Sequence, residues 1–446
     1  MKQFDRYKIY FLVISLWVFL CKFPSIRGDD HDDHEEERRL EPIRRRHISI
    51  QDSQLILFPG AMVEEMKPRP VLTAPLLLDG ESDNNYRAPN VLRRVLSLLN
   101  NVRSGSDLTR FQLPPSFNLP KSQLQCYGES VYSSRGNLLS KCANGESPLE
   151  RFLSVVAWSI STTRPLMFGV APYNPILGET HHVSRSNLNV LLEQVSHHPP
   201  VTALHATDEN DNIEMIWCHH PVSKFHGTYI ETEVHGKRQL KLLNNRETYL
   251  MNSPKLVIKF LPLIGVDWLG DVTIKCEETG LTAVLFYKGN SILPRVANHR
   301  AIKGEIFMAS SPSRTIYEIN GHWDRIVTAR DPSSGKSKVI YNAKEVLSEV
   351  KTPIVRESQG ILPSESTVVW GDVSQAILDK CWEKAKEAKS AIEGRQREMV
   401  KERNSKAENW VPEHFTVSYS KESGWECQPN QKLVPPAPII VPESFN

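Results

Sequence analysis

The chain has 446 residues, enough to bury a large core, and 40% of them are hydrophobic. Its formal net charge of +2 is nearly balanced, so no overall field points to nucleic acid as a partner. The seven cysteines are scattered and form no Cys-x-x-Cys pair. This usage is typical of reduced structural thiols and argues against a disulfide framework or a zinc site. We therefore expect a cytosolic main domain.

The N-terminus carries a pattern that resembles a targeting signal. Three basic residues and a continuous apolar run, Ile9–Cys21, have the charge and length of a signal-peptide core, and the run is short for a transmembrane helix. The sequence after it is a poor cleavage site, and no Asn-x-Ser/Thr motif occurs, which disfavours secretion. Residues 1–28 are therefore predicted to be either an apolar signal or anchor segment or a segment that targets nothing.

Residues 29–87 are predicted to form a disordered, charged extension. The stretch Asp29–His47 is acidic first and then basic, a pattern typical of solvated tails. Its basic end could also contact anionic lipid, although the solvated tail is favoured. Loop-forming sequences continue up to residue 87, and the main domain is expected to occupy residues 88–440.

An amphipathic helix is predicted at the start of this domain, within Ala88–Val102. Arginines and other polar residues separate its apolar residues, which recur at helical spacing. These apolar residues are Val91, Leu92, Val95, Leu96, Leu98, Leu99 and Val102. Such a helix can belong to the core, lie on a membrane surface or act as a movable cover. Taken alone, the segment favours the core.

The middle of the chain predicts short strands between turn formers such as DENDN, ETG and KGN. Helical patterns are few between residues 180 and 345. Antiparallel strands joined by hairpins, in a barrel or a large curved sheet, are therefore expected. The predicted strands are 189–195, 201–206, 213–218, 255–261, 271–276 and 281–287, followed by the runs GEIFMAS, TIYEING and SKVIYNA.

A long helix is predicted from Ser374 to about Ser405, because this segment is rich in Ala, Lys, Glu and Arg and lacks proline. Lys389, Glu393 and Arg397 lie along one face of it at i, i+4 and i+8. An exposed ion-pair ladder is the simplest interpretation. A lysine and an arginine braced by a glutamate also suit a phosphate group. The proline-rich tail that follows is expected to pack in an extended form.

The stretch EQVSHHPP, residues 193–200, places His197 and His198 side by side between two predicted strands. Adjacent strand side chains point to opposite faces, so the pair can share a ligand only where the backbone bends, and Pro199 restricts His198. Metal binding, acid–base catalysis, anion binding and a plain turn remain open, with the turn favoured. No cysteine pair supports zinc, and no nucleophile, P-loop or HExxH motif supports an enzyme.

Four motifs together carry a family resemblance. EQVSHHPP, the rigid turn APYNPILGE at 171–179, GHWDR at 321–325 and KSAIEGRQR at 389–397 resemble the oxysterol-binding-protein-related lipid-transfer family over about residues 88–435. The chain is most similar to short plant members that consist of the lipid-binding domain only. The resemblance implies a mainly β fold with helices (α+β). This fold is a large incomplete antiparallel β-barrel around a hydrophobic tunnel, with an N-terminal lid helix and a long C-terminal helix.

The resemblance also implies site residues. Those expected to bind a phosphoinositide head group are His197, His198, Asn174, Lys389, Glu393 and Arg397. Those expected at the lid and sterol tunnel are Val95, Leu98, Leu99, Leu108 and Phe111. One departure is Ala171, where the family usually has a lysine that contacts phosphate. Losing one charge-assisted contact costs about 1.5–3 kcal/mol, or one to two decades in affinity, unless nearby Arg164 compensates; sterol binding is unaffected.

The function that the resemblance implies is non-vesicular lipid transfer: the protein would bind one sterol, exchange it for phosphatidylinositol 4-phosphate and move it between membranes. A sterol or phosphoinositide sensor or tether without net transfer is the alternative, and a lipid hydrolase using His197 or His198 is less favoured. The implied partners are sterol, phosphatidylinositol 4-phosphate and membrane surfaces contacted peripherally. A monomer without cofactor, metal or enzymatic activity is expected, in the cytosol and at intracellular membranes such as the endoplasmic reticulum.

Overall fold

The computed structural model describes residues 70–443, except residues 77–87, 101, 110, 134–136, 262–263, 290–299 and 348–350. The described residues belong to one compact unit, which begins at Pro68. The predicted apolar segment 1–28 and the extension up to residue 69 lie outside the described residues. In the described part of the chain, no helix is both long and apolar enough to cross a membrane.

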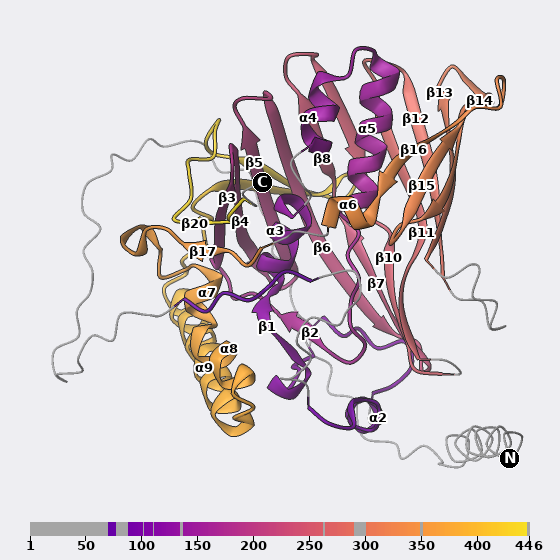
Figure 1. The fold of residues 1–446 in the computed structure, drawn as a ribbon. Coiled ribbons are helices and arrows are strands. Elements are labelled where there is room, and N and C mark those ends of the chain that lie inside the picture. The colour runs from indigo at the N-terminus through magenta and orange to yellow at the C-terminus, as the bar shows by residue number, and fades with distance from the viewer. Residues whose placement is uncertain are drawn as a thin grey trace, which may run out of the picture. The chain divides into compact units, whose positions relative to one another are not determined.

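A twisted, strongly curved sheet of 16 strands dominates this unit (Figure 1). Its path runs β16-β15-β14-β13-β12-β11-β10-β7-β6-β5-β4-β3-β20-β17, and β8 and β9 bridge β6 to β11. Successive strands pair antiparallel from β3 to β7, whereas β20 pairs in parallel with β3. The strands are β3 (Thr180–Arg185), β4 (Leu188–His197), β5 (Pro200–Asp208), β6 (Ile213–Phe225), β7 (Tyr229–His235), β8 (Arg238–Leu242), β9 (Glu247–Met251), β10 (Lys255–Lys259), β11 (Gly265–Cys276), β12 (Leu281–Lys288), β13 (Ala301–Met308), β14 (Ser311–His322), β15 (Ile326–Arg330), β16 (Ser337–Asn342), β17 (Ile354–Val355) and β20 (Ile439–Ile440).

Burial along the strands follows the sequence pattern. In β8 and β9, buried and half-buried residues alternate, as expected where one face meets the core. Strand β4 is instead buried at every position from 188 to 195, because both α3 (Gln123–Tyr132) and β18 (Phe415–Ser420) contact it. Five of the eight residues in LNVLLEQV are apolar and they fall on both faces, which suits a strand covered on both sides. Each of the nine predicted strands overlaps an observed one.

Helices α3, α4 (Asn137–Asn144) and α5 (Pro148–Ser161) lie against the sheet (Figure 1). Ser147 caps helix α5: its side chain accepts a hydrogen bond from a backbone N–H of the first turn, and a proline follows it. Both are preferred helix-start features. The apolar faces of the three helices and of the sheet share one large cluster. The main core therefore lies between these helices and the sheet.

The C-terminal helix differs from the prediction. A single helix over Ser374–Ser405 is wrong, since two helices occur, α8 (Gly371–Leu378) and α9 (Trp382–Ser405). Lys380 between them is left-handed, with φ of 57°. The N–H groups of Lys380 and Cys381 donate to carbonyls in the last turn of α8, at 3.0 and 2.8 Å. This is a Schellman motif, in which the left-handed residue is usually glycine. With lysine there, the sequence gives no signal for the break.

Shorter elements complete the domain. They are α2 (Val91–Leu99), η2 (Pro115–Phe117), β1 (Asn118–Ser122), β2 (Ala171–Tyr173), α6 (Ala343–Leu347), η4 (Ser358–Gly360), α7 (Ser366–Val369) and β19 (Gly424–Pro429). Strands β1 and β2 pair in parallel. The proline-rich tail is extended, as predicted, but part of it is also paired, because β18 and β19 form a hairpin.

Residues 70–76 also lie against the domain, although the sequence placed them in the extension. The N–H of Val71 donates to the carbonyl of Thr367 at 3.0 Å, and Nζ of Lys121 donates to the carbonyl of Ala74 at 2.9 Å. The domain therefore starts before residue 88. Composition misplaced this boundary because a short docked segment is held by backbone contacts that leave no periodic pattern.

Candidate functional site

His197 and His198 lie in the hairpin between β4 and β5, where the strand register shifts between Gln194 and Ser196. Their ring centroids are 4.5 Å apart. Nδ1 of His197 donates to the carbonyl of Pro175 at 2.9 Å, so its Nε2 is the other hydrogen-bonding position. Burial and the neighbouring His198 lower the pKa of His197. At neutral pH, Nε2 is therefore an acceptor, and it becomes a donor only when the ring is protonated.

The turn that carries Asn174 is anchored by Glu179. The buried carboxylate of Glu179 accepts hydrogen bonds from Oγ of Ser366 at 2.7 Å, Nε1 of Trp370 at 2.8 Å and the N–H of Ile176 at 3.0 Å. Burial raises the pKa of Glu179, and the hydrogen bonds oppose this rise. Asn174 itself is exposed. The hydrogen bonds to Glu179 thus hold the turn in place, and Asn174 lies at the surface of this turn.

Lys389 of α9 is buried and is held by acceptors inside the domain. Its Nζ donates to the carbonyl of Leu113 and to Oδ1 of Asn118, the latter at 3.0 Å, and Oε1 of Glu393 is 3.7 Å away. Burial lowers the pKa of Lys389, and the charge of Glu393 opposes this. Arg397, two turns further along, is exposed. The predicted face therefore combines a buried cation with an exposed one.

Asn118 connects Lys389 to the turn that precedes the histidines. Its Nδ2 donates to the carbonyl of Ala171 at 3.2 Å, and the same turn continues to Pro175, which His197 contacts. A continuous path of contacts thus joins α9 to the histidine hairpin. Of the six expected head-group residues, Lys389 and Glu393 are joined directly, as are His197 and His198. Ala171 supplies only a methyl group at the position of the family lysine.

Helix α2, the predicted cover, packs on strand ends at the rim of the sheet. It spans Val91–Leu99, within the predicted Ala88–Val102, and after its last turn the N–H of Asn100 bonds three residues back, to Ser97, at 3.4 Å. Its apolar face joins a cluster with Phe225 and Phe260. Four of the expected lid residues belong to this cluster, namely Val95, Leu98, Leu99 and Leu108. The fifth, Phe111, is half-buried outside it.

Gly169 allows α2 to approach closely. Its φ is 78°, and a Cβ there would clash with Cγ1 of Val91. On another side of the helix, a hollow of about 520 Å³ lies between α2 and η2, with Arg93 and Arg94 among its lining residues. The guanidinium of Arg94 donates to Oγ of Ser116 at 2.6 Å. The cover is thus held by apolar packing and by one arginine.

A group of buried polar side chains within the main domain was not predicted from the sequence. The guanidinium of Arg238 lies 4.3 Å from the centroid of the Trp217 ring and donates to Oγ1 of Thr162 at 2.8 Å. His219 packs edge-on against Tyr127, with centroids 4.6 Å apart. Burial lowers the pKa of Arg238 to about 10 and that of His219 to about 3. At neutral pH the arginine is therefore charged and the histidine neutral.

Several of these side chains, and other buried side chains of the domain, keep unused hydrogen-bonding atoms. Within the described part of the chain, the buried atoms without a partner include Nε of Arg238, Nε1 of Trp217, Nε1 of Trp158, Nη1 of Arg164 and Nε2 of His219. An unpaired buried polar atom costs roughly 1–3 kcal/mol, so such atoms mark a place for a ligand's polar group or for water. The residues come from separate segments, and no sequence motif links them.

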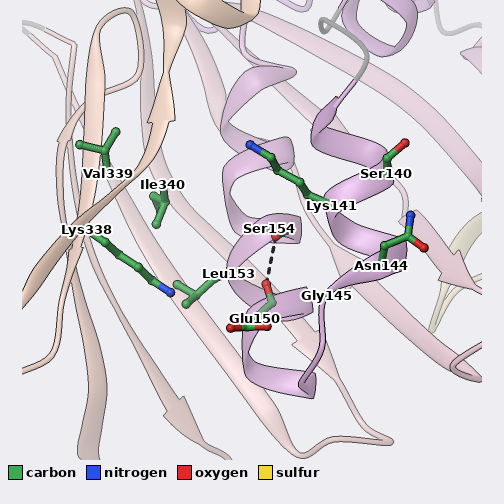
Figure 2. A pocket seen from close by; sticks show the side chains of 10 residues that line it. All are labelled: Ser140, Lys141, Asn144, Gly145, Glu150, Leu153, Ser154, Lys338, Val339 and Ile340. Carbon is green, nitrogen blue, oxygen red and sulfur yellow. Dashed lines mark hydrogen bonds between the residues drawn. The ribbon is translucent and has the colours of Figure 1, made fainter.

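A second hollow, of about 510 Å³, lies between α4, α5 and the edge strand β16 (Figure 2). Polar residues of the two helices line one side of it, and Val339 and Ile340 line the other. The hydrogen bond drawn in Figure 2, from Oγ of Ser154 to the carbonyl of Glu150 at 3.0 Å, is internal to α5. None of the residues expected from the sequence contributes to this groove.

No group of three or more His, Cys, Asp or Glu among the described residues is placed to hold a metal ion. The carbonyl of Pro175 fixes the tautomer and orientation of the His197 ring through Nδ1, as a carboxylate, a carbonyl or a water does for a ligating histidine. Nε2 of His197 is thus the ring atom that a ligand would meet.

Comparison with known proteins agrees with the four motifs. The family model described as Oxysterol-binding protein matches residues 95–433. The chain belongs to the oxysterol-binding protein family. Oxysterol-binding protein-related protein 4C of Arabidopsis thaliana is 52% identical over 380 residues, which cover 84% of this chain and 100% of that relative. Oxysterol-binding protein-related protein 5 of Mus musculus is 32% identical over 355 residues, 76% of this chain and 40% of that relative.

Solved structures share the fold of this family member. The Osh1 ORD domain in complex with cholesterol matches with a TM-score of 0.65 and 22% identity, over 81% of this chain and 90% of that one. The Osh3 ORD of Saccharomyces cerevisiae in complex with PI(4)P matches with a TM-score of 0.60 and 22% identity, over 76% and 91%. The predicted fold class, a mainly β incomplete barrel with helices, is confirmed.

Proposed function

We propose that this domain binds one sterol molecule inside the curved sheet, beneath α2, and moves it between membranes without vesicles. The observation that carries the proposal is the pairing of an apolar cover on the rim of the sheet with unpartnered polar atoms in the buried interior. A sterol has an apolar body and one hydroxyl group, which can accept from Arg238 and donate to neutral His219. The Osh1 domain, solved with cholesterol, has the same fold.

Extraction would begin when α2 opens at a membrane. Opening separates its apolar face from Phe225 and Phe260, which is unfavourable in water but is offset where that face meets lipid. Burial of the sterol then contributes ~25 cal/mol per Å² of apolar surface removed from water. Because the cycle makes and breaks no covalent bond, the protein acts as a carrier, and we propose neither enzymatic activity nor a cofactor.

We further propose a head-group site for phosphatidylinositol 4-phosphate at the surface between the histidine hairpin and α9. Its residues are His197, His198, Asn174, Lys389, Glu393 and Arg397. Supporting this, the contact path through Asn118 connects the two halves of the site. Affinity is expected to be lower than in relatives with a lysine at position 171, since Nζ of Lys389 is bound by Leu113 and Asn118. The Osh3 domain was solved with this type of lipid.

The setting that fits this function is the cytosol. The six cysteines of the described residues are free thiols, as in reducing compartments. We propose that the protein works there as a monomer and contacts intracellular membranes, such as the endoplasmic reticulum, peripherally.

A sterol transfer assay tests the carrier function. Donor liposomes would contain the fluorescent sterol dehydroergosterol, and acceptor liposomes would contain none. We expect each protein molecule to move many sterol molecules to the acceptors. Uptake of one sterol per protein without further transfer would indicate a sensor or tether instead. Neither uptake nor transfer would overturn the proposal.

A further inference from the structure

Two cysteines that are distant in sequence meet in the fold. The sulfur atoms of Cys218 and Cys427 lie 3.1 Å apart, although 209 positions separate them in the chain. Cys218 belongs to β6 and Cys427 to β19, and these strands pack together. Both side chains are buried, at 4% and 3% exposure. The pair therefore sits in a buried part of the fold.

The backbone on each side of the sulfur pair is held by hydrogen bonds. The N–H of Cys218 donates to the carbonyl of Lys237 at 3.0 Å, and Cys427 pairs with Val417 across the β18–β19 hairpin. The surroundings of the two sulfur atoms are an apolar cluster of valine, alanine and phenylalanine side chains. Among the described residues, no group of three or more His, Cys, Asp or Glu is placed to hold a metal ion, and the two thiols face each other.

We propose that Cys218 and Cys427 form a reversible disulfide when the protein meets a low-molecular-weight disulfide, and that this bond clamps the β18–β19 hairpin to β6. A disulfide bond is about 2.05 Å long, so the two sulfur atoms must approach by about 1 Å. This movement is small compared with the rearrangement that distant cysteines would require.

The exchange balances as a two-step reaction. The thiolate of one cysteine attacks the small disulfide, forms a mixed disulfide and releases one small thiol. The second cysteine then attacks the protein sulfur of that mixed disulfide and releases the second small thiol. The two cysteine protons end on the released thiols, and the two electrons lost by the cysteines reduce the small disulfide.

While the β18–β19 hairpin is packed on β6, the two cysteines are protected from this reaction. The contact with Cys218, together with burial, raises the pKa of the Cys427 thiol, and a protonated thiol is a poor nucleophile. The first step therefore needs the hairpin to open. Beside Cys427, the ion pair of Lys237 and Glu426, at 2.6 Å, lies at the surface, where such pairs stabilise little. Local opening of this edge is the expected entry route.

The disulfide would stabilise a segment that supports the histidine hairpin. Glu193, the first residue of EQVSHHPP, accepts hydrogen bonds from the N–H groups of Glu413 at 2.9 Å and His414 at 2.8 Å. These two residues directly precede β18. Fixing β19 to β6 also closes a loop that spans most of the domain, which lowers the entropy of the unfolded chain. Oxidation would thus rigidify the back of the site.

The test is disulfide mapping of the folded full-length chain. After incubation with oxidised glutathione at pH 8, free thiols are blocked with iodoacetamide and the peptides are analysed by mass spectrometry. We expect a Cys218–Cys427 cross-link that dithiothreitol removes, and a melting temperature several degrees above that of the reduced protein. Cys427→Ser should lose both effects. The matched control, Cys381→Ser, removes an exposed cysteine and should keep both.

Two results would overturn the proposal, and both are read on the wild-type chain, so a variant that fails to fold does not affect them. The first is recovery of Cys218 and Cys427 as blocked thiols or separate glutathione adducts from folded protein, with the cross-link appearing only in urea. The second is a cross-link without any rise in melting temperature, which would mean that the bond clamps nothing.

Discussion

The side chain of Asn118 links Lys389 to the backbone of Ala171 by two hydrogen bonds. Asn118 accepts from Nζ of Lys389 at 3.0 Å and donates to the carbonyl of Ala171 at 3.2 Å. A cation therefore already lies near the position where the family usually has a lysine. That cation is also bound by the carbonyl of Leu113, on the segment that follows the lid. Its ammonium group therefore already donates hydrogen bonds to acceptors inside the domain, so fewer of its N–H donors remain for a phosphate group.

Restoring the family lysine should strengthen phosphoinositide binding. In Ala171→Lys, one added charge-assisted hydrogen bond contributes about 1.5–3 kcal/mol, so affinity for phosphatidylinositol 4-phosphate should rise by roughly ten- to a hundredfold. Titration with liposomes containing this lipid measures the change. Ala171→Met is the control, because it adds length without charge. Equal gains in both variants, or none in the lysine variant, would contradict the proposed head-group site.

We expect Arg238 to contribute more to sterol affinity than to the stability of the fold. Arg238→Met removes a buried charge that pairs with no carboxylate among the described residues, so the melting temperature should stay the same or rise. Sterol affinity should fall about tenfold, because the loss of one hydrogen bond is about 1.4 kcal/mol. Dehydroergosterol binding and thermal unfolding report the two quantities.

The matched control for that experiment is Arg151→Met. Arg151 is also buried, but its Nε donates to the Glu247 carboxylate at 2.9 Å. Its replacement leaves the buried Glu247 carboxylate with the Tyr249 hydroxyl but without a cation, and should lower the melting temperature while sterol affinity stays unchanged. The account of the buried polar group is wrong if Arg238→Met unfolds more easily and still binds sterol normally.

Closure of the cover should depend on Gly169. In Gly169→Ala, the new methyl group meets Cγ1 of Val91, which prevents α2 from seating fully. Release of bound dehydroergosterol should become several times faster. Gly105→Ala is the control, since φ there is 92° but nothing lies within 4 Å of the new Cβ. It carries the same backbone strain without the clash. Similar release rates in the two variants would argue against α2 as the cover.

The buried imidazole of His219 should make the fold sensitive to acid. Its folded pKa is lowered from 6.5 to about 3, so the unfolded state binds a proton first. The stability due to the neutral ring is present above pH 6.5 and is lost as pH falls towards 3. Between pH 7.5 and 5 the loss is about 2 kcal/mol. Urea unfolding of wild type and His219→Asn measures it, and the variant should show the shallower pH slope. Parallel slopes would refute this assignment.

Much of the fold follows from the sequence because the predicted strands alternate or run apolar over a short span. The approximate place of the cover helix and the motif turns were predictable for the same local reason. The break at Lys380 was not, since its left-handed residue is no glycine. Nor was the contact of Cys218 with Cys427, or the approach of Arg238 to Trp217. These relationships join distant segments, and only the register of the sheet brings them together.

The most direct test of the carrier proposal is native mass spectrometry of the protein recovered from liposomes that contain sterol and phosphatidylinositol 4-phosphate. The lidded interior predicts one sterol molecule per chain in wild type, retained through gel filtration and reduced in Arg238→Met. Phosphatidylinositol 4-phosphate should appear mainly in Ala171→Lys. Recovery of the wild-type chain with no lipid bound would contradict the proposal at its centre.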